Sequence, residues 1–258
     1  MTIVNLSGKA IFMTGALGAI GAHVVRRLAA TGATLALTDL KSEAEGQATL
    51  SEWRIEPTQF SYHSLDVNDP ATVSKTVDEA FENHPELDTV LGHAGGCGLH
   101  PFAETSEQEF ERIFRFNYLA QTYLARAALA QWVRRGIAGH LIFTSSYVAR
   151  VPHTRIPAYA TAKAALECLT KCLALDYAHA GIRVNAISPG NVAAGSSLKV
   201  FETDRDYRDF VLRVSPLGER NSPEAVADVF VFLCSPLGRE VNGQVLSVDM
   251  GVSIPKIG

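Results

Sequence analysis

The 258-residue sequence has few cysteines, no excess of basic residues and no long apolar segment. Its four cysteines, Cys97, Cys168, Cys172 and Cys234, lack the spacing of zinc ligands, so we expect reduced, mostly packed thiols and no metal site. A formal net charge of -4 provides no basic surface for nucleic acid. No apolar run approaches the ~18 residues of a membrane span, and no secretory signal is visible. These absences favour a soluble, cytoplasmic protein without nucleic-acid or membrane partners.

The sequence does contain a regular alternation of apolar runs and helical patterns. We expect strands at about residues 10–13, 34–38, 59–63, 87–91, 139–144, 183–188 and 244–248. Helices are expected at about residues 23–29, 42–53, 70–83, 106–135, 157–180 and 223–234. Apolar strands that alternate with helices predict an α/β fold, a doubly wound parallel sheet covered on both faces. Because no linker or repeat interrupts the pattern, we expect a single domain over residues 1–258, with a substrate lid at about 191–215.

A glycine-rich segment, Thr14 to Gly21, lies between the first expected strand and the first helix. Its glycines permit a tight turn and close approach of a pyrophosphate, which the helix N-terminus favours, although a simple tight turn would look similar. Asp39 ends the second strand, eighteen residues after Gly21, where a carboxylate can bind both ribose hydroxyls and would repel a 2′-phosphate. This favours NAD over NADP, with Lys41 as the nearby cation that would soften the preference. Asp66 is expected near the adenine, or only as the cap of the following turn.

Tyr159 and Lys163 are four residues apart at the start of the helix expected from residue 157. This spacing places both side chains on one helix face, one turn apart. A tyrosine hydroxyl with a pKa of about 10 is a poor base at neutral pH, but a nearby ammonium favours the phenolate and lowers that pKa. Ser146 follows the expected strand 139–144 and would face the crevice where open α/β sheets bind ligands. The pair alone is common on helices; combined with Ser146 and the glycine-rich segment, it predicts a proton-transfer site.

Taken together, these residues resemble the short-chain dehydrogenase/reductase family over residues 6–251, with a Rossmann fold. The shared motifs are Thr14–Gly21, Asp66–Val67, Asn117, Ser146, Tyr159-x-x-x-Lys163, Pro189–Gly190, Asn242–Gln244 and Val248–Gly251. The resemblance implies hydride transfer between C4 of nicotinamide and a carbonyl or alcohol carbon. Tyr159 would be the acid/base, Lys163 would lower its pKa and hold the nicotinamide ribose, and Ser146 would orient the substrate oxygen. Asn117 would help to hold a water that relays protons. The implied cofactor contacts are Gly15, Leu17, Gly18, Ala19, Ile20, Gly21, Asp39, Leu40, Asp66, Val67, His93, Ala94, Gly95, Tyr159, Lys163, Pro189, Gly190 and Val192.

Three positions depart from the family pattern. Ala19 stands where a glycine is usual, and its methyl group narrows the approach to the pyrophosphate. His93 replaces an asparagine that ties neighbouring strands, and we expect the histidine to make a similar structural bond. Ala194 replaces a threonine that contacts the nicotinamide carboxamide, a contact that Ser196 or Ser197 would have to supply.

Polar side chains between Ser146 and Tyr159 indicate a small hydroxylated substrate, because guanidinium groups suit carboxylates and phosphates. The expected substrate contacts are Ser146, Arg150, His153 and Tyr159, with Arg155 and His100 as further candidates, unless these arginine and histidine side chains merely face solvent. We therefore expect an NAD-dependent dehydrogenase of a sugar, polyol or sugar acid. The alternatives are a reductase of 3-oxoacyl thioesters or other ketones, and a non-catalytic dinucleotide sensor. The resemblance also implies a homotetramer or homodimer formed by the two long helices.

Overall fold

Seven short, apolar strands form one sheet in the computed structural model, which describes residues 4–254, without the side chain of Ser196. The strands are β1 (Ala10–Thr14), β2 (Thr34–Asp39), β3 (Phe60–Ser64), β4 (Thr89–Gly92), β5 (His140–Thr144), β6 (Arg183–Pro189) and β7 (Val245–Val248). They lie in the order β3-β2-β1-β4-β5-β6-β7, and every neighbouring pair is parallel. All five residues of β1 and all five of β5 are buried, as expected for strands that are covered on both faces. The predicted doubly wound parallel sheet is confirmed.

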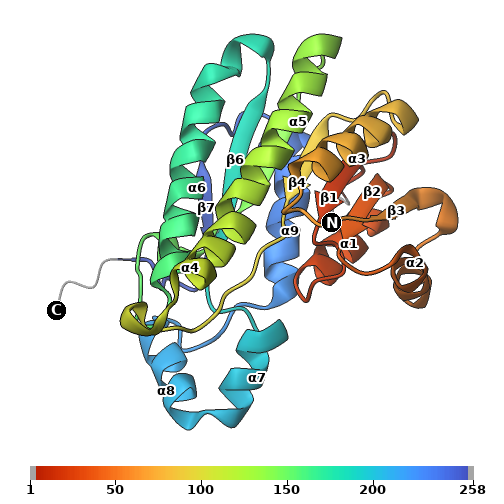
Figure 1. The fold of residues 1–258 in the computed structure, drawn as a ribbon. Coiled ribbons are helices and arrows are strands. Elements are labelled where there is room, and N and C mark those ends of the chain that lie inside the picture. The colour runs from red at the N-terminus through yellow and green to blue at the C-terminus, as the bar shows by residue number, and fades with distance from the viewer. Residues whose placement is uncertain (1–3, 255–258) are drawn as a thin grey trace.

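Helices cover both faces of this sheet (Figure 1). The helices are α1 (Gly21–Ala30), α2 (Glu43–Glu52), α3 (Pro70–Asn83), α4 (Glu107–Phe114), α5 (Ala120–Arg135), α6 (Pro157–Asp176), α7 (Gly195–Thr203), α8 (Arg205–Val214) and α9 (Pro223–Cys234). Helices α3, α5 and α6 bury their apolar residues in one core, and α1 and α9 bury theirs in a second core. Figure 1 shows α7 and α8 together at one end of the molecule, below the strands, where the sequence predicted a lid.

Two helix boundaries differ from the sequence-based expectation. The long helix predicted over residues 106–135 is interrupted by a π-helical turn, Arg115–Leu119, between α4 and α5. The helix predicted to reach residue 180 ends at Asp176, and a 3-10 turn, Ala178–Ala180, follows it. Gly181 then has φ +71, a left-handed conformation that closes the connection to β6. Neither change alters the order of the elements.

The prediction of mostly packed thiols is wrong. Cys97, Cys168 and Cys172 are exposed, and among the four cysteines only Cys234 is buried. Cys168 and Cys172 lie four residues apart on the outward face of α6, and Cys97 lies in the loop after β4.

Within residues 4–254, none of the helices combines the length and hydropathy that a bilayer crossing requires.

Candidate active site

A cavity of about 950 Å³ opens at the carboxyl ends of the strands, bounded by the glycine-rich segment after β1, the loops after β4 and β5, and residues of α7 and α8. This is the edge at which open α/β sheets bind ligands. Most of the expected site residues line this cavity. Those that do not are Leu17, Gly21, Asn117 and Arg150.

The structure brings Ser146, Tyr159 and Lys163 together. Ser146 follows β5, and Tyr159 lies in the first turn of α6, which starts at Pro157, where a missing N–H costs nothing. The hydroxyls of Ser146 and Tyr159 are hydrogen-bonded. The Nζ of Lys163 donates to the Thr144 carbonyl at 2.8 Å and lies 5.6 Å from the Tyr159 ring centroid. The three side chains therefore form one cluster on the cavity wall.

Burial dominates the acid–base properties of this cluster. It raises the pKa of the Tyr159 hydroxyl above its usual value, the nearby Cys97 adds to this, and the hydrogen bond with Ser146 acts in the opposite direction. Burial also lowers the pKa of Lys163 to about 8. The sequence predicted that Lys163 would lower the pKa of Tyr159. In this structure the pKa is raised instead, because burial disfavours the charged phenolate.

The glycine-rich segment fits a bound dinucleotide. Gly15 has φ +69, and a Cβ there would lie 2.8 Å from the Cα of Ala94. A Cβ on Gly21 would lie 2.3 Å from the carbonyl oxygen of Gly15. Glycine at these positions keeps the turn tight, as the close approach of a pyrophosphate requires. Leu17 and Gly21 lie outside the cavity, so their part in this turn is to support it.

Asp39 projects into the same cavity from the end of β2. Its Oδ2 accepts from the Leu17 N–H at 2.9 Å, and its Oδ1 accepts from the Leu40 N–H at 2.8 Å. These bonds fix the carboxylate without using all its lone pairs. Asp66 also lines the cavity, and its Oδ1 accepts from the Asn68 N–H at 2.9 Å. Asp66 therefore caps the following turn and faces the cavity at once.

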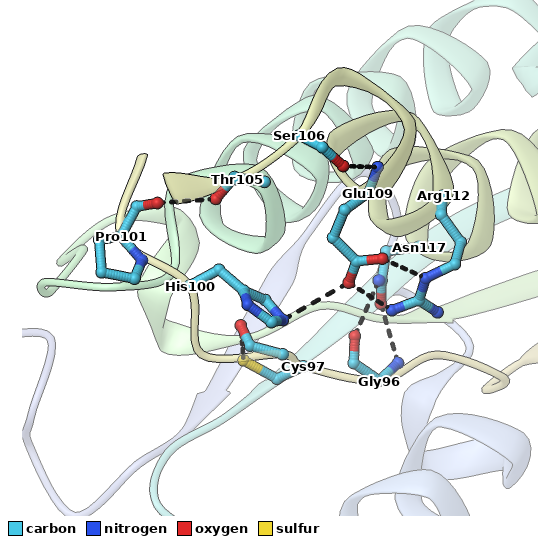
Figure 2. Close-up of polar contacts among 10 residues, drawn as sticks. Gly96, Cys97, His100, Pro101, Thr105, Ser106, Glu109, Arg112 and Asn117 are labelled. Atoms are coloured by element: carbon cyan, nitrogen blue, oxygen red, sulfur yellow. Dashed lines mark hydrogen bonds and ion pairs between the residues drawn. The ribbon is translucent and has the colours of Figure 1, made fainter. Parts of the chain in front are cut away.

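Asn117 supports the loop after β4 rather than the cavity wall (Figure 2). Its Nδ2 donates to the Gly96 carbonyl at 2.8 Å, and its Oδ1 accepts from the Gly96 N–H at 3.0 Å. The Nδ2 also donates to the Ile113 carbonyl at 2.9 Å. Both amide hydrogens are thus used. The side chain lines only a small adjoining cavity of about 140 Å³. The geometry gives the Asn117 side chain a positioning role.

His93 ties two neighbouring strands, as predicted from its place in the sequence. It follows β4, and its Nδ1 is 2.9 Å from the Oγ1 of Thr144 at the end of β5. Its ring packs edge-on against Phe230 of α9 with centroids 5.8 Å apart. Burial, with a smaller effect of the Lys163 charge, lowers the pKa of His93 to about 4. The ring is therefore neutral at pH 7.

The loop between Ser146 and Tyr159 is arranged differently from the sequence-based expectation. Arg150 does not line the cavity, because its Nε pairs at 3.3 Å with Glu167 of α6. Arg155 is exposed and also lies outside the cavity. His153 does line the cavity, with its ring between those of Tyr147 and Phe210. Of the expected contacts that are specific to this loop, only His153 remains.

Sequence reasoning missed two polar residues of this region. Tyr147 donates from its hydroxyl to the Oδ1 of Asn191 at 3.3 Å, and both residues line the cavity. Each directly follows a residue that the sequence did identify, Ser146 or Gly190, so proximity to a motif was the available signal. His100, a further candidate, lies outside the cavity and pairs with Glu109 at 3.5 Å (Figure 2).

Comparison with known proteins is consistent with this geometry. A family model described as enoyl-(acyl carrier protein) reductase matches residues 15–253. The chain is 31% identical to versicolorin reductase of Emericella nidulans, covering 96% of each chain. It is 30% identical to L-rhamnose 1-dehydrogenase (NAD(P)(+)) of Sphingomonas sp., covering 96% of this chain and 98% of the relative.

A solved dehydrogenase/reductase from Sinorhizobium meliloti superposes with a TM-score of 0.87 at 30% identity, covering 97% of both chains. The match therefore extends over the sheet and the helices, including α7 and α8. With the family model spanning nearly the whole sequence, the chain belongs to the short-chain dehydrogenase/reductase family of oxidoreductases, which bind a nicotinamide cofactor and act on small molecules with CH–OH or ketone groups.

Proposed function

We propose that this protein is an NAD-dependent dehydrogenase of a small polar substrate, namely a sugar, a polyol or a sugar acid. The observation that carries the choice of NAD is Asp39, whose carboxylate is held by two backbone N–H groups inside the cavity. A fixed negative charge at the end of β2 accepts hydrogen bonds from both hydroxyls of an adenosine ribose and repels a 2′-phosphate. Lys41, the nearby cation considered from the sequence, is not among the residues that line the cavity.

The polar character of the substrate is supported by the cavity wall beside Ser146 and Tyr159. His153, Tyr147 and Asn191 all line this wall. The Nδ1 of His153 lies 2.9 Å from the carbonyl of Thr154, which can only accept a hydrogen bond, so Nδ1 donates to it and Nε2 is the nitrogen left for a substrate. Hydroxyl groups next to the reacting carbon match such a wall better than an acyl chain does.

In the proposed reaction, Tyr159 takes the proton of the substrate alcohol on its Oη while hydride leaves the carbon. A bound oxidised nicotinamide supplies the hydride acceptor, and its positive charge favours the phenolate of Tyr159. Ser146 holds the substrate oxygen beside Tyr159 through its hydroxyl. Lys163, fixed on the Thr144 carbonyl, places its ammonium beside the tyrosine ring. Asn117 keeps the loop at Gly96 in place below them.

The proposal is tested by a screen of sugars, polyols and sugar acids with NAD and with NADP. We expect oxidation with NAD, and a kcat/KM for NAD at least about tenfold above that for NADP, since removing one repulsive charge contact is worth about 1–3 kcal/mol. An Asp39→Ala variant should lower the ratio of kcat/KM for NAD to that for NADP. A wild-type preference for NADP, or turnover of apolar alcohols alone, would contradict the proposal.

A second candidate is a reductase of 3-oxoacyl thioesters or other ketones. The description of the matching family model and the resemblance to versicolorin reductase favour it. Ketone reduction with NADPH in the same screen would identify this activity. A third candidate is a non-catalytic dinucleotide sensor, and a Tyr159→Phe variant distinguishes it from an enzyme. If the protein is an enzyme, the variant should still bind NAD but lose turnover. If the protein is a sensor, the variant should keep its biological effect.

We also propose that the chain forms a homotetramer or homodimer through α5 and α6. The outer face of α6 exposes Leu175 by 80%, and Val133 of α5 is 52% exposed. Most of the alanines of α5 and α6 are buried within the protein, for example Ala128 and Ala162, and are not available to such an interface. Light scattering on the purified protein measures the mass directly, and a monomer would contradict the proposed oligomer.

A cytoplasmic location stays a prediction from the sequence, which cell fractionation can check.

A further inference from the structure

Arg220 links the lid to the floor of the cavity. It lies in the segment between α8 and α9, and its Nη2 donates to the Val192 carbonyl at 2.5 Å and to the Ser197 Oγ at 2.9 Å. Its guanidinium also stacks on the ring of Phe201 in α7, 4.4 Å from the centroid. Val192 and Ser197 both line the cavity, beside Pro189 and Gly190 at the end of β6. One side chain therefore sets the position of the first turn of α7.

The bond from Arg220 determines what the Ser197 hydroxyl can do. A guanidinium has donors only, so Ser197 Oγ must accept from it. A hydroxyl has one hydrogen and two lone pairs, and this arrangement leaves the hydrogen available for donation. Among the described residues, the hydroxyl has no acceptor for that hydrogen. Ser197 is therefore prepared as a donor on the wall of the cavity.

We propose that Arg220 presents the Ser197 hydroxyl as the hydrogen-bond donor to the carboxamide oxygen of bound nicotinamide. The inference rests on the proposed cofactor binding and goes beyond it by naming this pair. Ala194 lines the same end of the cavity but carries no hydroxyl. Ser197 is three residues further on and lies on the same helix turn as Ala194, the residue preceding α7. Arg220 is then a positioning residue, and Ser197 a cofactor-binding residue.

The other guanidinium nitrogens of Arg220, Nε and Nη1, are buried without a hydrogen-bond partner among the described residues. The Nη2 atom therefore makes both of the hydrogen bonds that fix this side chain to Val192 and Ser197.

The first test compares NADH with ADP-ribose, which lacks the nicotinamide, as ligands of Ser197→Ala. Loss of one neutral hydrogen bond should weaken NADH binding about three- to tenfold, measured by fluorescence titration or calorimetry. Binding of ADP-ribose should stay within about twofold of wild type, since no contact to it is removed. Equal losses for both ligands, or no loss for NADH, would overturn the inference.

A second test asks whether Arg220 acts through Ser197. Arg220→Met should also weaken the binding of NADH more than the binding of ADP-ribose. The double variant should bind NADH as tightly as whichever single variant binds it less tightly. Strictly additive losses would show independent roles and contradict the positioning part. Arg205→Ala is a matched control on the lid, because this arginine is exposed and pairs only loosely with Asp209 at 3.8 Å. If Arg220→Met does not fold, Ser197→Ala still decides the carboxamide contact.

Failure of the proposed cofactor choice would be recognisable separately. A wild type that prefers NADPH would contradict the NAD proposal. The same comparison with NADPH and 2′-phospho-ADP-ribose would then test Ser197 unchanged. A wild type that binds none of these four ligands would overturn both proposals together.

Discussion

Lys163 is a buried cation whose place in the site is energetically unfavourable for folding. Burial lowers its pKa from 10.5 to about 8, so the folded protein binds its proton less tightly than the unfolded chain. Between pH 8 and 10.5 the unfolded state binds more protons, and stability rises with pH through that window. Below pH 8 both states are protonated, and the full cost of burying the charge is present.

Replacing Lys163 with methionine should therefore stabilise the protein while abolishing turnover. We expect Lys163→Met to raise the free energy of unfolding at pH 7 by about 1–3 kcal/mol, and the advantage to shrink towards pH 10.5. Urea unfolding of both proteins at several pH values measures this. Thr144→Ser, which keeps the carbonyl that Lys163 binds, serves as a control. An advantage that is independent of pH would show that the lysine is not the source.

At the scale of elements, helix α6 carries the proposed catalytic groups and is anchored by Glu167. Tyr159, Lys163 and Glu167 follow at intervals of four residues and so share one face of the helix. The Oε1 of Glu167 accepts from the Ser145 hydroxyl at 2.9 Å, and its Oε2 pairs with Arg150 at 3.3 Å. The end of β5 and the following loop are thereby fixed to α6.

Removal of this anchor should affect both activity and stability. Glu167→Gln keeps an acceptor for Ser145 but leaves Arg150 without its charge partner, so we expect a loss of about 1–2 kcal/mol in stability. We expect kcat to fall severalfold with little change in NAD affinity, because the register of Tyr159 with Ser146 loosens. Steady-state kinetics and urea unfolding test this. Glu79→Gln is the control, since Glu79 forms an exposed pair with Lys75. Unchanged kcat in Glu167→Gln would contradict the anchoring role.

The sequence was informative where function depends on local spacing. Tyr159 and Lys163 share a helix face because they are four residues apart, and Ser146 lies at the cavity because it follows a buried strand. Arg150 could not be placed in this way, because its partner Glu167 lies in another element. The π-helical turn at Asn117 also escaped detection, since the sequence around it keeps a regular helical pattern.

At the scale of the whole molecule, two buried neutral histidines link folding to pH. Burial lowers the pKa of His93 to about 4. Burial, with a smaller effect of Arg183, lowers that of His140 to about 3. Their value in the unfolded chain is about 6.5. Because both folded-state values are depressed, the unfolded chain binds more protons below pH 6.5, and stability is lost as the pH falls from there towards 4.

We expect each of these two histidines to lower the free energy of unfolding by about 2–3 kcal/mol between pH 6.5 and pH 4, so that stability falls steeply with acid. The double variant His93→Asn, His140→Asn should show a shallower loss of stability between pH 6.5 and 4, as followed by circular dichroism. His179→Asn is the control, because His179 is exposed. Equal acid sensitivity of the double variant and the wild type would assign the effect to other groups.

The π-helical turn at Arg115–Leu119 gives the α4–α5 segment a phase shift. An extra residue in one turn rotates all later side chains by about 100° relative to an uninterrupted α-helix. Deleting one residue from this turn would leave a regular helix with every backbone hydrogen bond intact, yet it would swing either Asn117 or the buried face of α5 out of place. Tolerance of substitution in this segment should therefore far exceed tolerance of a change in its length.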